Sequence, residues 1–127
     1  MTTVIHVNGI LEDEYGVVCP IKTKFGSPAA SGVNAFIAAV SGRRIRVLAY
    51  RVQAAGTVAL TFVDTTTGPQ SLSAPWSLQA REGAVATAFP GGYEFQTDVG
   101  VGVQVSLNAA VACNVMVQYI EASGESR

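Results

Sequence analysis

The feature that most constrains this chain is a two-residue alternation of apolar and polar side chains. In residues 57 to 64, the apolar side chains of Val58, Leu60 and Phe62 fall on one face, and residues 101 to 108 place an apolar side chain at every second position. A period of two is that of a β-strand with one buried face. Helical periodicity is almost absent, so the pattern predicts an all-β fold.

The segment of residues 111 to 121 differs because it is apolar on both faces. Val115 and Val117 fall on one face, whereas Met116 and Ile120 interrupt the polar residues of the other. A strand with two apolar faces is either central in a covered sheet or covered by a partner.

Turn residues divide the rest of the chain into further short strands. We predict them at residues 3–8, 16–25, 33–40, 44–53 and 83–88. Residues 53–57 and 107–111 are predicted to be hairpin turns, residues 64–76 a loop between the sheets or over one end, and residues 89–95 a turn. About eight short strands with this spacing predict an antiparallel, jelly-roll-like β-sandwich with an N-terminal arm.

Length and composition limit the organisation of the protein. The 127 residues suit one domain, and we divide them into an arm with the first strands (1–30), a sandwich (31–122) and a polar tail (123–127). Charged residues make up only 13%, whereas about a quarter is usual. We therefore expect other subunits to cover part of the apolar surface.

Charge and hydropathy argue against several partners. A net charge of −1 gives no basic field for nucleic acid, and no apolar run approaches the roughly 20 residues of a membrane span. The N-terminal residues lack the pattern of a signal peptide, which predicts synthesis in a cytoplasm.

No residues form a recognisable catalytic set, and we predict no enzymatic activity and no cofactor. His6 is the single histidine, and neither Cys19 nor Cys113 belongs to a metal-binding motif. We predict that both cysteines are small buried side chains, and that a disulfide between them is disfavoured in a reducing compartment.

Two charged clusters are candidate interface sites. Arg43, Arg44 and Arg46 begin an apolar strand, in which Arg44 and Arg46 should share one face while Arg43 and Arg51 lie on the other. These arginines are either solvated strand ends or partners of carboxylates across an interface, a role that suits the guanidinium group.

The second cluster, Glu12, Asp13 and Glu14, is acidic. It is either a solvated turn or the partner of arginines on another subunit, and it lacks the spacing of a calcium loop.

Residues 31 to about 121 resemble a pattern found in tailed phages and prophages. The opening "SGVNAFIAAVSGRRIRVLAY" matches "SGxNxxxAAVxGxxIRVLAY", and "QAAGTVALTFVD" and "GVQVSLNAAVACNVMVQY" follow at the corresponding places. The resemblance is to the head decoration (cement) proteins. It implies a small β-sandwich of the virion exterior, often a homotrimer, which binds the major capsid protein and has no catalytic residues.

The decoration hypothesis gives the N-terminal arm a role. We expect residues 1 to 15 to reach onto the capsid protein, because they are separate from the sandwich and contain the acidic cluster. An alternative is a tail or fibre module that binds a host glycan or receptor. That alternative requires exposed aromatic side chains near loops, for which Trp76, Tyr93 and Phe95 are the candidates, although such residues also serve to anchor loop ends in the core.

Overall fold

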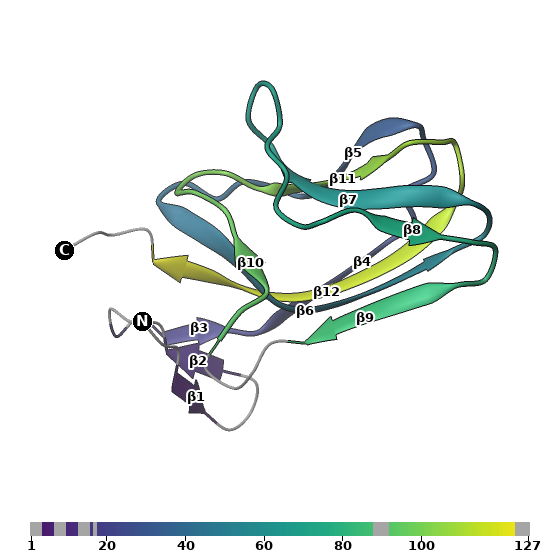
Figure 1. The fold of residues 1–127 in the computed structure, drawn as a ribbon. Coiled ribbons are helices and arrows are strands. Elements are labelled where there is room, and N and C mark those ends of the chain that lie inside the picture. The colour runs from purple at the N-terminus through teal and green to yellow at the C-terminus, as the bar shows by residue number, and fades with distance from the viewer. Residues whose placement is uncertain (1–3, 7–9, 13–15, 17, 88–91, 124–127) are drawn as a thin grey trace.

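The fold is known from a computed structural model, which describes residues 4–6, 10–12, 16, 18–87 and 92–123. Every regular element in these residues is a β-strand. Two antiparallel sheets lie face to face as the layers of a sandwich, and a small third sheet lies beside one end (Figure 1). The predicted antiparallel β-sandwich is confirmed, whereas its jelly-roll character stays a prediction.

The strands of each sheet come from distant parts of the chain. The five-stranded sheet has the order β10-β6-β12-β4, with β9 also paired to β6. Its strands are β4 (Lys22–Gly26), β6 (Arg43–Ala54), β9 (Gly83–Thr87), β10 (Phe95–Gln96) and β12 (Cys113–Ser123). The four-stranded sheet has the order β5-β11-β7-β8. Its strands are β5 (Gly32–Ile37), β7 (Val58–Asp64), β8 (Trp76–Leu78) and β11 (Val103–Leu107).

The core lies between the two sheets and is formed by the alternating side chains. The inward residues of β7 and β11 are buried as predicted: Val58, Leu60, Phe62, Val103, Val105 and Leu107. They face the buried side chains of β12 and β6, including Val115, Val117 and Val52. At roughly 25 cal/mol per Å² of apolar surface, this burial is the main force that holds the layers together.

The two predicted hairpin turns are wrong, because each connection crosses from one sheet to the other. Residues 55–57 join β6 to β7, and residues 108–112 join β11 to β12. The connections lie side by side, since Ala55 donates its backbone N–H to the Ala112 carbonyl at 2.9 Å. A short turn can join two strands that pair in one sheet, or two strands that face each other from different sheets. Here the joined strands lie in different sheets, and their apolar faces meet across the core.

Of the two alternatives predicted for residues 64–76, a loop between the sheets or over one end, the loop between the sheets is wrong. These residues join β7 to β8 within the four-stranded sheet, where Leu60 pairs with Trp76 and Val58 with Leu78. The loop turns back on β7 because Leu72 donates its backbone N–H to the Phe62 carbonyl at 2.7 Å.

A β-bulge changes the faces of β6. Gln118 of β12 pairs with Ala49, but the next residue, Tyr119, pairs with Val47, so Leu48 is the extra residue. Before the bulge Ile45 and Val47 face the core, and after it Tyr50, Val52 and Ala54 do. The predicted alternation therefore fails beyond Leu48. Arg51 lies on the same outer face as Arg44 and Arg46, not on the opposite one.

The predicted strand at 16–25 is two strands in different sheets. β3 (Val18–Pro20) joins β1 (Val4–His6) and β2 (Ile10–Glu12) in the third sheet, while β4 pairs with β12 in the sandwich. Pro20 has no N–H to continue a ladder, which suits a strand end. The predicted N-terminal segment 1–30 thus contributes β4 to the main sheet.

β3 also covers part of the sandwich. Cys19 and Ile21 pack against Ile120, Ala122 and Leu48 on the outer face of the five-stranded sheet.

None of the described residues forms a helix of the length and apolarity needed to cross a membrane.

Both cysteines are buried, as predicted. Cys19 packs beside Ile120, whereas Cys113 starts the same strand. The span from Cys113 to Ile120 is about 23 Å at roughly 3.3 Å per strand residue. Disulfide geometry needs Cα atoms within about 7 Å, so this fold keeps the thiols apart.

Candidate interaction surface

The arginine cluster lies at one end of β6. Arg43 donates from Nη1 to the Glu121 carbonyl at 3.3 Å, and Arg44 donates from Nη1 to the Thr97 carbonyl at 3.3 Å. Arg44 also lies 4.0 Å from the highly exposed carboxylate of Asp98. An exposed pair of this kind contributes about 0–1 kcal/mol. The side chains of Arg43 and Arg44 are half-buried, and their hydrogen bonds hold loop and strand ends together.

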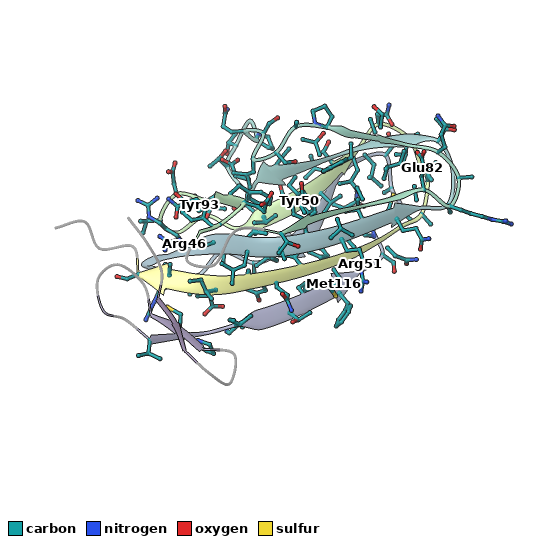
Figure 2. The ribbon with its side chains drawn as sticks, turned by 60° about the horizontal axis from the view of Figure 1, so that its bottom comes forward. Arg46, Tyr50, Arg51, Glu82, Tyr93 and Met116 are labelled. Carbon is teal, nitrogen blue, oxygen red and sulfur yellow. The ribbon has the colours of Figure 1, made fainter. Side chains whose placement is uncertain are left out.

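Arg46 is more deeply placed, with only 1% of its surface exposed. Its Nε donates to Oε1 of Gln96 at 3.0 Å, and its guanidinium carbon lies 5.0 Å from the centre of the Tyr93 ring. Figure 2 shows Tyr93 and Arg46 together at this end of the sheet. These contacts give Arg46 a structural role within the chain. Of the three arginines, Arg43 and Arg44 retain exposed surface.

The acidic cluster is only partly described. Glu12 ends β2, where its backbone is paired with Val4 on one side and Val18 on the other. Asp13 and Glu14 lie outside the described residues. The role predicted for these three carboxylates therefore stays a prediction.

The aromatic candidates of the receptor hypothesis mostly point inward. Trp76 donates from Nε1 to the Tyr50 hydroxyl at 2.9 Å, and Phe95 is buried in the core. The Tyr50 and Phe62 rings meet edge to face with centres 4.7 Å apart. Burial raises the pKa of the Tyr50 hydroxyl above its ordinary value, and the hydrogen bond from Trp76 partly opposes this effect. Tyr93 is the exposed member of the predicted set, at 38%.

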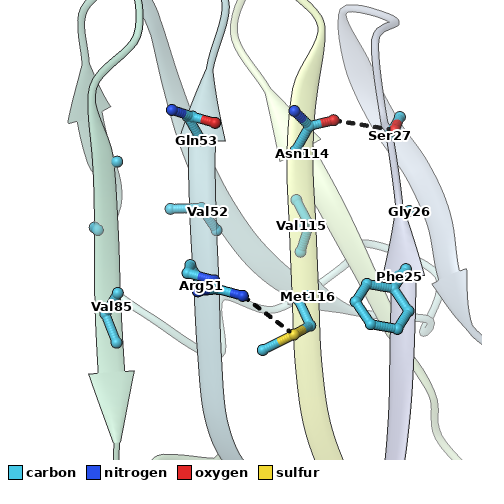
Figure 3. A pocket seen from close by; sticks show the side chains of 12 residues that line it. Phe25, Gly26, Ser27, Arg51, Val52, Gln53, Val85, Asn114, Val115 and Met116 are labelled. Carbon is cyan, nitrogen blue, oxygen red and sulfur yellow. Dashed lines mark hydrogen bonds between the residues drawn. The ribbon is translucent and has the colours of Figure 1, made fainter.

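The most exposed apolar side chains lie on the outer face of the five-stranded sheet. Met116 of β12 pairs with Phe25 of β4 on one side and with Arg51 of β6 on the other, and Arg51 pairs with Val85 of β9. We call these four residues the exposed row. Phe25 is 70% exposed and Val85 64%. Four neighbouring strands thus present one continuous line of side chains (Figure 3).

An open hollow of about 740 Å³ lies over this row. Ser27, Gln53 and Asn114 form its polar rim, where the Ser27 hydroxyl and the Asn114 side-chain oxygen are 3.3 Å apart. Gly83 forms part of the floor, and a Cβ atom there would come within 2.8 Å of the Val52 carbonyl oxygen. The hollow is open to solvent, so the surface of another molecule can reach the row.

Sequence reasoning did not select the exposed row as a site, although one signal was available. In the sequence, Met116 is an apolar residue on the second face of the segment 111–121. The position of Arg51 beside it depends on the bulge at Leu48, and that of Phe25 depends on the separation of β3 from β4. Pairing between distant strands is not visible in local periodicity.

The described residues contain no group of three or more His, Cys, Asp or Glu side chains that could hold a metal ion. Comparisons with protein families, curated proteins and solved structures found no match to this chain. The surface must therefore be interpreted from its own chemistry and from the sequence pattern described above.

Proposed function

We propose that this protein is a structural component of a bacteriophage virion. It is a decoration (cement) protein that binds between subunits of the major capsid protein and stabilises the mature head. The observation that carries the proposal is the exposed row. A small sandwich that leaves apolar side chains on three of four neighbouring strands exposed is suited to burying them in an assembly. The resemblance of residues 31 to about 121 supplies the type of assembly.

The low proportion of charged residues supports the proposal that this protein works as part of an assembly. With 13% charged residues, much of the chain surface is neutral or apolar, and such a surface is favoured at contacts between subunits. The chain is made in the host cytoplasm and acts on the outside of the capsid as a homotrimer. Arg43 and Arg44, with their remaining exposed surface, are candidates for contacts between subunits.

Decoration would stabilise the head by linkage. A protein that binds the assembled lattice but not its separated subunits shifts the equilibrium toward the assembled form by an amount that depends on its concentration relative to Kd. Repetition of the site over the lattice, together with several contacts per trimer, would give a large total effect from modest individual affinities.

A binding experiment tests the proposal. Purified protein is incubated with empty expanded heads and, separately, with tails of the phage that encodes it, and bound protein is measured after sedimentation. Saturable binding to heads, with a higher temperature of head disruption, is the expected result. Binding to tails or host cells alone would contradict decoration and favour the tail or fibre alternative, in which Tyr93 is the aromatic residue to test.

A further inference from the structure

The outer face of the five-stranded sheet is covered along only part of its length. At one end, Ile120 and Ala122 are buried beneath Cys19 of the chain's own third sheet. Toward the other end of the same strand, Met116 is partly exposed, and its neighbours Phe25 and Val85 are largely exposed. The outer face therefore has a covered apolar end and an uncovered apolar end, with the exposed polar side chain of Gln118 between them.

The uncovered half includes a guanidinium group. Arg51 stands between Met116 and Val85 in the exposed row, and its side-chain contact there is a weak one from Nη2 to the Met116 sulfur at 3.7 Å. Among the described residues, no carboxylate forms an ion pair with Arg51. Arg51 is exposed, so its guanidinium group can pair with a carboxylate of a partner, which accepts two parallel hydrogen bonds.

The same features disfavour two other occupants. A polyanion such as nucleic acid requires several cations, and the exposed row has a single one on a chain with a net charge of −1. A twofold pairing of two such faces about an axis along the row would place two Arg51 side chains opposite each other without a counter-ion. A protein segment with a single negative charge needs only one cation, and it brings no second guanidinium group to Arg51.

We propose that the exposed row binds a segment of a second protein that presents a carboxylate between apolar side chains. The carboxylate pairs with Arg51, while the apolar side chains cover Phe25, Met116 and Val85. This inference rests on the proposed function, in which the second protein is a subunit of the capsid lattice. The partner segment would cover the exposed half of the outer face, as β3 covers the other half.

Affinity for purified expanded heads tests the inference. The variants are Arg51→Glu, Arg51→Lys and Phe25→Ala, and the matched control is Arg81→Glu, which makes the same charge change at an exposed position in the turn before β9. We expect Arg51→Glu to raise Kd at least about thirtyfold and Phe25→Ala about tenfold. Arg51→Lys should have an intermediate effect, because lysine keeps the charge but loses the bidentate geometry. Arg81→Glu should bind like the wild type.

Because Phe25 and Arg51 are exposed, these substitutions should leave the fold intact, which far-UV circular dichroism and Tm verify. Amidation of the head carboxylates with a carbodiimide and glycinamide should weaken wild-type binding to the level of Arg51→Glu. Equal binding by wild type, Arg51→Glu and Phe25→Ala would overturn this inference and leave the proposed function standing. Failure of the wild type to bind heads would overturn both.

Discussion

At the scale of single residues, Asp64 shows how one carboxylate shapes a long loop. Its Oδ1 accepts hydrogen bonds from the Thr66 hydroxyl at 2.6 Å, the Gln70 backbone N–H at 2.9 Å and the Thr66 backbone N–H at 3.2 Å. The hydrogen bond from the Thr66 hydroxyl is the main cause that lowers the pKa of Asp64 from its ordinary value of 3.8. Partial burial acts in the opposite direction and is outweighed.

This geometry predicts the pH dependence of stability. Since the pKa of Asp64 is lower in the folded chain than in the unfolded chain, its contribution is complete above the ordinary value of 3.8. That contribution is lost as the pH falls through the lower folded value. Urea unfolding at pH 7 and pH 3 should therefore show a larger loss of unfolding free energy in the wild type than in Asp64→Asn. Identical losses would contradict this account of the loop.

The same carboxylate allows a comparison at neutral pH. Asp64→Ala removes all three hydrogen bonds and should lower the free energy of unfolding by about 1–3 kcal/mol. Asp64→Asn keeps an acceptor oxygen, so its free energy of unfolding should fall by less than that of Asp64→Ala. An Asp64→Ala variant as stable as the wild type in urea would show that the loop does not depend on this side chain.

Residue roles were predictable where they followed from a local pattern. The buried faces of β7 and β11, and the burial of the cysteines, could be predicted from alternation and composition. The contacts of Arg46 with Gln96 and Tyr93 could not, because β6 and the segment at 93–96 meet only through the fold. A cluster of arginines in sequence therefore contains one buried residue and two half-buried ones.

At the scale of elements, most strands were predictable but their partners were not. Alternation located β7, β11 and β12 within two residues at each end, whereas β2, β8 and β10, with three residues or fewer, gave no periodic signal. The crossing turns were misjudged as hairpins because turn length alone does not specify whether two strands pair or face each other. The bulge at Leu48 likewise depends on the pairing of β6 with β12.

The junction between β5 and β11 provides a prediction at this scale. A Cβ atom on Gly102 would lie 2.7 Å from the Ala39 backbone nitrogen and closer still to the Ile37 carbonyl oxygen. Backbone atoms cannot move aside as a flexible side chain can, so Gly102→Ala should lower the free energy of unfolding by about 1–3 kcal/mol.

Gly56 provides the matched control in the crossing turn between β6 and β7. A Cβ atom there meets only the Val111 side chain, at 3.5 Å. Gly56→Ala should therefore be neutral or stabilise the protein by up to about 1 kcal/mol, since alanine restricts the unfolded chain. Equal urea midpoints for the two variants would show that the close backbone approach at Gly102 is unimportant.

At the scale of the whole molecule, the central feature is a sheet face that the chain only half covers. The sequence indicated it in general terms through the low charge and the second apolar face at Met116. The composition of the exposed row emerges only when four strands from different parts of the chain are placed in register. Its four residues span positions 25 to 116, which no local motif could have joined.

A cryo-electron microscopy map of the phage head with the protein bound tests this account most directly. The account predicts that the outer face of β4, β12, β6 and β9 is turned toward the capsid lattice, with the Arg51 guanidinium against a carboxylate of a lattice subunit and the Phe25 ring buried. A map in which the protein is attached to the head while Phe25, Arg51, Met116 and Val85 face open solvent would contradict it.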